Sequence, residues 1–136
     1  MNVTGAVVAY LRADGRVSGL AAERVYGSEL PRSAAAELPR KTIVVMASGI
    51  GGTVGDRSDV RETGNRMDIR CYGETPYQAD VLHGAVYRAM KDLRRERHDD
   101  ITLQVAEVGG GPLPGRDTDA DWPYTLGVYV VNATYD

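Results

Sequence analysis

The chain has 136 residues, of which 43% are hydrophobic and 26% charged, and its formal net charge is −3; this length suits one domain with one ordinary core. The small negative charge argues against general affinity for nucleic acid, because such affinity needs Lys or Arg to displace counterions from phosphates. No stretch approaches the roughly 20 apolar residues that cross a bilayer, and no basic start followed by an apolar run marks a secretory signal, so we expect a soluble protein made in the cytoplasm, with no membrane partner.

The chain begins with the pattern of a short helix. Asn2 or Thr4 is expected to cap it, and Gly15 lies where such a helix often ends. Its apolar stripe contains Val3, Val7, Tyr10 and Leu11. Because a helix this short is marginal alone, it must pack on a sheet.

Shorter elements follow this helix. Residues 17–23 fit one further turn, and residues 24–26 fit a short strand that stops at Gly27. Pro31 and Pro39 then bracket a stretch that we expect to be a loop.

Two strands come next in the sequence. Residues 42–48 are apolar on both faces, which is typical of a strand covered on both sides. Residues 65–71 alternate strictly, which predicts one face in a core and one in water: Met67, Ile69 and Cys71 against Arg66, Asp68 and Arg70. Cys71 is the only cysteine, so no internal disulfide forms, and its place on the apolar face predicts a small buried side chain in a reducing compartment.

Residues 49–64 lie between these strands and keep no apolar period. They mix glycines with charges of both signs: Asp56, Arg57, Asp59, Arg61 and Glu62. We expect a long hairpin excursion that is functional or mobile. Gly49, Gly51, Gly52 and Gly55 follow a strand, which invites a phosphate-loop interpretation, but such a loop needs a following helix and a Lys at fixed spacing. Nucleotide binding is therefore the less favoured interpretation.

The strongest helix pattern spans residues 76–97. Thr75 can cap it, Pro76 suits the first helical position, and Gln78 completes a capping box. The apolar stripe contains Ala79, Leu82, Val86, Met90 and Leu93. Acidic residues near the start and basic residues near the end complement the helix dipole, namely Glu74 and Asp80 against Lys91, Arg94, Arg95, Arg97 and His98.

The last part of the chain predicts a strand over residues 101–106, a loop over 109–122 and a strand over 124–135. Asp117, Asp119 and Asp121 resemble the opening of a calcium loop, but Trp122 and Val128 stand where Gly and Glu are required, so a solvated acidic loop is preferred. Trp122 either holds the loop to the body or faces a partner.

No residues suggest a reactive centre. His83 and His98 are the only imidazoles, and they are interpreted as a semi-buried side chain and a helix-terminal cation. No Ser or Cys has an evident base partner, and no spacing matches a metal site. We therefore predict no catalytic residue, no metal, no cofactor and no enzymatic activity.

The order of elements predicts an α+β fold, with a mainly antiparallel sheet, two helices packed on one face and a long β-hairpin excursion. No linker divides residues 1–136.

This order resembles the tail terminator, or tail completion, proteins of long-tailed bacteriophages. The resemblance covers nearly the whole chain and rests on the short first helix, the Val25-Tyr26 strand, the proline-containing loop, the hairpin and three segments, residues 66–73, 77–82 and 124–130. A head–tail joining protein could look the same. The resemblance implies a single tail-terminator-like domain without catalytic residues.

What the resemblance implies further is a hexameric ring in the tail or neck of a virion, assembled in the host cytoplasm. Such a ring caps the tail tube protein, ends tail elongation and meets the head–tail connector protein, while DNA passes through the lumen without specific binding. The alternatives are another neck or head-completion protein and, less favoured, a small nucleotide-binding module.

Ring contacts join two different patches of neighbouring subunits. We expect the mixed charges of Asp56, Arg57, Asp59, Arg61 and Glu62 to set the register between subunits, with Asp119, Asp121 and Trp122 as further contact residues. Charge reversal of Arg57 and Arg61 should weaken ring formation, and unchanged assembly would count against this hypothesis.

Overall fold

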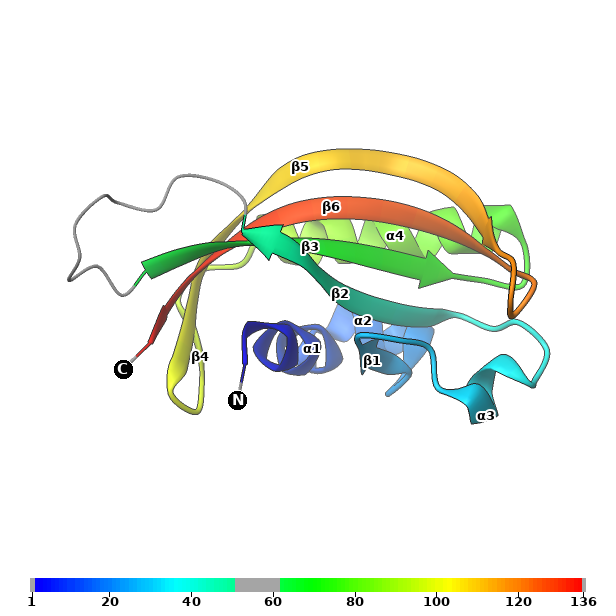
Figure 1. The fold of residues 1–136 in the computed structure, drawn as a ribbon, viewed down its shortest axis with the longest axis horizontal. Coiled ribbons are helices and arrows are strands. Elements are labelled where there is room, and N and C mark those ends of the chain that lie inside the picture. Colours follow the sequence, from blue (N-terminus) through cyan, green and yellow to red (C-terminus); the bar gives the residue numbers. More distant parts are fainter. Residues whose placement is uncertain (1, 51–61, 136) are drawn as a thin grey trace.

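The computed structural model describes residues 2–50 and 62–135. Within them lie four helices, α1 (Val3–Ala13), α2 (Gly15–Ala21), α3 (Arg32–Ala35) and α4 (Pro76–Lys91). The six strands are β1 (Val25–Gly27), β2 (Thr42–Ile50), β3 (Glu62–Tyr72), β4 (Glu96–His98), β5 (Ile101–Asp117) and β6 (Trp122–Tyr135). This is the predicted α+β fold (Figure 1), and no helix in the described ranges is long and apolar enough to span a membrane.

The strands form one curved sheet in the order β1-β2-β3-β6-β5-β4. β1 runs parallel to β2, and the other neighbouring pairs are antiparallel. β2 and β3 are consecutive strands that pair, as the hairpin prediction required, and their pairing continues to Ile50 and Asn65. β5 and β6 arch together over the molecule (Figure 1).

One face of the sheet carries the main core. Side chains of α1, α2 and α4 pack there against strand residues that include Ile43, Ile69 and Val131. Cys71 is fully buried in this core, as predicted, and burial raises the pKa of its thiol. The two predicted helices therefore do pack on one face, and α2 joins them.

The first helices are set by side-chain caps. Asn2 accepts a 2.7 Å hydrogen bond from the N–H of Gly5, which confirms one of the two predicted caps. α1 ends at Ala13 with Asp14 as its C-cap, so Gly15 directly follows the helix end, as predicted. Asp14 also accepts hydrogen bonds from the N–H groups of Arg16 and Val17 and so starts α2.

Helix α4 begins as predicted and ends early. The hydroxyl of Thr75 accepts a 3.2 Å hydrogen bond from the N–H of Gln78. The predicted extension to residue 97 is wrong, because Arg95 takes a φ of 49° and its N–H donates to the carbonyl of Gln104, which starts the β4–β5 hairpin. His98 consequently lies on β4 and not at a helix end.

Two predicted loops contain regular structure. The stretch between the prolines holds α3. Residues 109–117 continue β5, which pairs with β6 through register shifts at Gly110 and nearby positions. β4 pairs with β5 only from Ile101 to Leu103. Pro112 and Pro114 therefore lie on a free edge of the sheet, as far as the described chain shows. Proline has no backbone N–H to donate, and at this edge no neighbouring strand would accept one.

Candidate assembly surface at the β5–β6 turn

The sheet face turned away from α1, α2 and α4 is called the open face. Val44, Arg70 and Leu126 lie side by side across β2, β3 and β6 on this face. Because side chains alternate along a strand, the charged half of residues 66–70 falls here, as predicted. Arg66 is exposed, and Arg70 is half-buried.

Aromatic side chains gather where the open face meets the β5–β6 turn. Tyr72 packs edge-to-face against Trp122 and Tyr124, with ring centroids 5.7 Å and 5.8 Å apart. The Arg70 guanidinium lies 4.7 Å from the centre of the Tyr124 ring. Such aromatic pairs stabilise by about 0.5–1.5 kcal/mol beyond their burial. Tyr72, Trp122 and Tyr124 form, together with Val44, a second and smaller hydrophobic core beside the turn.

Asp117, the last residue of β5, fixes the shape of this turn. Its Oδ1 accepts hydrogen bonds from the N–H groups of Asp119 (2.9 Å) and Ala120 (3.0 Å). Its Oδ2 accepts from the Tyr72 hydroxyl at 3.0 Å and lies 3.7 Å from Arg70 Nη1. Burial raises the pKa of Asp117, but these hydrogen bonds and the Arg70 charge outweigh it and hold the pKa below its ordinary value. The carboxylate is therefore ionised at neutral pH.

The segment around α3 covers the aromatic cluster from outside. Trp122 Nε1 donates a 3.3 Å hydrogen bond to the carbonyl of Glu37, and Leu30 packs against the same cluster. Trp122 is 0% exposed. Of the two alternatives left open by the sequence, Trp122 therefore holds the turn to the body.

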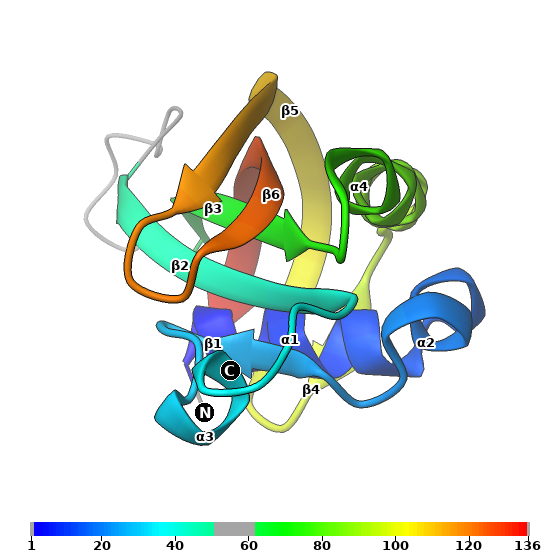
Figure 2. The same ribbon diagram turned by 90° about the vertical axis from the view of Figure 1, so that its right-hand side faces the viewer.

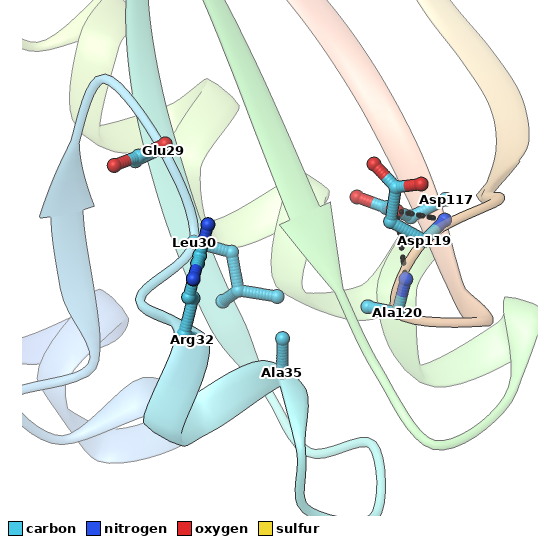
Figure 3. A pocket seen from close by; sticks show the side chains of 7 residues that line it. All are labelled: Glu29, Leu30, Arg32, Ala35, Asp117, Asp119 and Ala120. Carbon is cyan, nitrogen blue, oxygen red and sulfur yellow. Dashed lines mark hydrogen bonds between the residues drawn. The ribbon is translucent and has the colours of Figure 1, made fainter.

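An open pocket of about 460 Å³ lies between this segment and the turn. Figure 3 shows its two walls, with the residues of the α3 segment across from those of the turn. The lining combines apolar side chains with charges of both signs: Glu29, Leu30, Arg32, Ala35, Asp117, Asp119 and Ala120. No group of three or more His, Cys, Asp or Glu side chains in the described ranges is placed to hold a metal.

The predicted contact residues are only partly brought together here. Asp119 and Asp121 are exposed on the turn, and Asp121 pairs with Arg116 at 3.1 Å. Glu62 starts β3 opposite Thr134. The remaining predicted contacts lie outside the described residues, namely Asp56, Arg57, Asp59 and Arg61.

The α3 wall of the pocket was missed by the sequence reasoning. A signal was present, because Pro31 precedes an alanine-rich run and both favour a helix start. Of the phosphate-loop alternative, Gly51, Gly52 and Gly55 lie outside the described residues.

Two buried polar side chains lie on the core side of the sheet. His83 of α4 is 8% exposed and Tyr129 of β6 is 1% exposed. A Cβ at Gly127 would lie 2.8 Å from His83 Cε1 and 3.0 Å from the Tyr129 hydroxyl, so both rings flank this glycine. Neither His83 Nδ1 nor the Tyr129 hydroxyl has a hydrogen-bond partner among the described residues. Burial lowers the pKa of His83, which is therefore neutral at pH 7.

No protein-family model matches the chain, and no curated protein sequence is similar to it. Among solved structures, its fold is similar to that of a chain described as part of the virion of a native gene transfer agent particle. The TM-score is 0.65 at 20% sequence identity, and the similarity covers 97% of this chain and 94% of that chain. The two chains therefore share a fold over nearly their whole lengths.

Proposed function

We propose that the chain is a non-enzymatic structural protein of a phage-like particle. The observation that carries this proposal is the shared fold with a chain of the gene transfer agent virion, which leaves almost no part of either chain unmatched. This shared fold agrees with the resemblance to tail terminator proteins, which rests on the sequence.

In its finer form, the proposal is a tail terminator with one domain over residues 1–136. It assembles as a hexameric ring, caps the tail tube protein, ends tail elongation and joins the tail to the head–tail connector protein. DNA passes through the lumen without specific binding, and the formal charge of −3 supports this part. The protein acts in the virion after assembly in the host cytoplasm.

The candidate pocket supports a role in protein contacts. Its lining combines the apolar side chains of Leu30 and Ala35 with charged side chains that include Glu29, Arg32 and Asp119, a mixture that suits contact with another protein. Asp117 and the aromatic cluster hold its β5–β6 wall in place, so binding there needs little ordering of the turn. Asp119 and Asp121, together with the charged residues between 56 and 62, remain proposed contacts to neighbouring subunits or the tail tube.

Electron microscopy of the purified protein, alone and mixed with tail tubes, tests this proposal. We expect six-membered rings, free or at one end of the tubes, and native mass spectrometry should give the mass of six copies. A species that stays monomeric at high concentration and ignores tail tubes would contradict the tail-terminator role. Binding to connector assemblies without binding to tail tubes would favour the alternative of a head-completion protein.

A further inference from the structure

The outward side of α4 carries a stripe of residues that is symmetric about Gly84. Seven residues at helical spacing form this outer α4 stripe: Tyr77, Asp80, Val81, Gly84, Tyr87, Arg88 and Lys91. Gly84 is half-buried and the other six are exposed. In Figure 2, α4 lies at the outside of the molecule, and no other described helix or strand covers its outward side. We propose that the outer α4 stripe binds the same stripe of a second copy of this chain, with the two helices antiparallel about a twofold axis at Gly84.

The kinds of side chain along the stripe occur in mirrored order. A twofold axis through Gly84 sets each residue opposite the one at the same distance on the other side of Gly84 in the second copy. Val81 and Tyr87, which are apolar and aromatic, stand three residues before and after the axis. Asp80 and Arg88, which carry opposite charges, stand four residues before and after it. The stripe is therefore complementary to an antiparallel copy of itself.

The charges on the stripe are available for a partner. Asp80, Arg88 and Lys91 form no ion pair within residues 2–50 and 62–135. In the proposed dimer, Asp80 of each copy meets Arg88 of the other, so the twofold axis creates two such pairs. Parallel helices in the same register would instead bring Asp80 to Asp80 and Arg88 to Arg88. The charges therefore favour the antiparallel arrangement.

Gly84 allows the two helices to approach closely at the axis. Glycine is a poorer helix former than alanine, yet Gly84 stands near the middle of a helix of 16 residues. Apart from its chain neighbours and the backbone of its own helix, an added Cβ would meet only the guanidinium of Arg88 among the described atoms, at 3.8 Å and 3.9 Å. Packing inside the subunit therefore does not require glycine here, whereas the close passage of a second backbone does.

Apolar and aromatic side chains flank the axis. Val81 is 39% exposed and Tyr87 is 38% exposed, so each has surface left to bury against the other copy. The Nζ atom of Lys91 lies 5.9 Å from the centre of the Tyr87 ring, and Tyr77 of the second copy, seven residues from the axis, would approach the same ammonium group. One pair of helices makes a small interface, so we expect a dimer that dissociates on dilution.

This contact goes beyond the proposed ring. A ring joins two different patches of neighbouring subunits, whereas the α4 contact joins the same patch of two copies. The ring contacts proposed at Glu62, Asp119 and Asp121 lie outside α4. The two kinds of association are therefore separable by experiment. Loss of a two-copy species reports on the α4 contact, and loss of a six-copy species reports on the ring.

Two charge-reversed variants and their mixture test the pairing by native mass spectrometry. Asp80→Arg and Arg88→Asp each place like charges opposite one another, so each variant alone should dimerise about 100-fold more weakly than the wild type. In an equal mixture the charges between the two different chains are again opposite, and heterodimers should form without homodimers. Glu107→Arg, at another exposed acidic position, should dimerise like the wild type. A wild type without a two-copy species, variants that dimerise normally alone, or a mixture without heterodimers would overturn the inference.

A cross-link tests the position of the axis. A disulfide needs Cα atoms about 4.4–6.8 Å apart, which the axis provides for Gly84→Cys in two copies. Oxidation with diamide should link this variant into dimers at least about 10-fold faster than Gly19→Cys, a matched change at an exposed glycine of α2. The native Cys71 is 0% exposed and stays unreactive in both. Equal rates of linkage for the two variants would show that the helices do not meet at Gly84.

Discussion

The hydroxyl of Tyr10 donates a 2.6 Å hydrogen bond to the backbone carbonyl of Ala89. The bond joins α1, at the start of the chain, to the last turns of α4. Burial raises the pKa of Tyr10, so the hydroxyl keeps its proton and remains a donor at neutral pH. The positions of the two helices on the sheet are thus tied to each other by a polar contact as well as by the core.

Tyr10→Phe should lower the free energy of unfolding by about 1 kcal/mol, the usual net contribution of a buried hydrogen bond. Urea denaturation measures the change. Tyr135→Phe is the control, because Tyr135 is 37% exposed, and its effect should stay within about 0.5 kcal/mol. Equal midpoints for the two variants would show that the bond to Ala89 adds no stability.

Trp122→Ala should destabilise the fold by about 3–5 kcal/mol, because it empties the centre of the aromatic cluster. The loss should appear in urea denaturation and in the aromatic circular dichroism signal. Leu38→Ala, at an 86% exposed position, serves as control and should be nearly neutral. A Trp122→Ala protein with normal stability and defective assembly would place Trp122 in an interface instead.

Gly127→Ala should destabilise the protein by about 1–3 kcal/mol, because the added methyl group meets the rings of His83 and Tyr129. Gly19→Ala is a matched change in α2, where the added Cβ has no heavy atom within 4 Å apart from its chain neighbours and the nearby backbone of its own helix. It should stabilise the protein by about 0.5–1 kcal/mol, since alanine favours a helix more than glycine does. Thermal unfolding of both variants checks the opposite signs.

Stability should fall as the pH drops below about 6.5, the ordinary pKa of histidine. Burial lowers the pKa of His83 in the folded protein, while the charge of Asp80 opposes this shift. In this range the unfolded chain therefore binds the proton more readily than the folded chain, and unfolding is favoured. Above that pH, the contribution of His83 is constant.

Urea denaturation between pH 5 and 7.5 measures this dependence. His83→Leu removes the titrating group, and its stability should change less over the same interval than that of the wild type. Parallel curves for the two proteins would show that His83 does not cause the acid sensitivity.

Local signals in the sequence were sufficient for the elements that form the main core. Thr75, Pro76 and Gln78 lie within four consecutive residues, so the start of α4 is specified by a local signal. The alternation of residues 65–71 likewise predicted which half of β3 is buried, because each side chain follows from its position along the strand.

The candidate site depends on contacts between distant segments and was only partly predictable. Gly110 and Pro112 argue for a loop in isolation, yet pairing with β6 holds this stretch in a strand. Asp119 was expected on an exposed acidic loop, but its place opposite Arg32 in a pocket requires α3 to lie over the turn. Trp122 meets Glu37, 85 residues away, and no local pattern predicts that hydrogen bond.

The long strand β5 also bears on how copies of the chain can associate. An unprotected strand edge acts as a template for other chains and leads to fibres and aggregates. Pro112 and Pro114 interrupt the donors along this edge, and the register shifts around Gly110 bend it. Strand addition by another copy is thereby disfavoured along this part of β5.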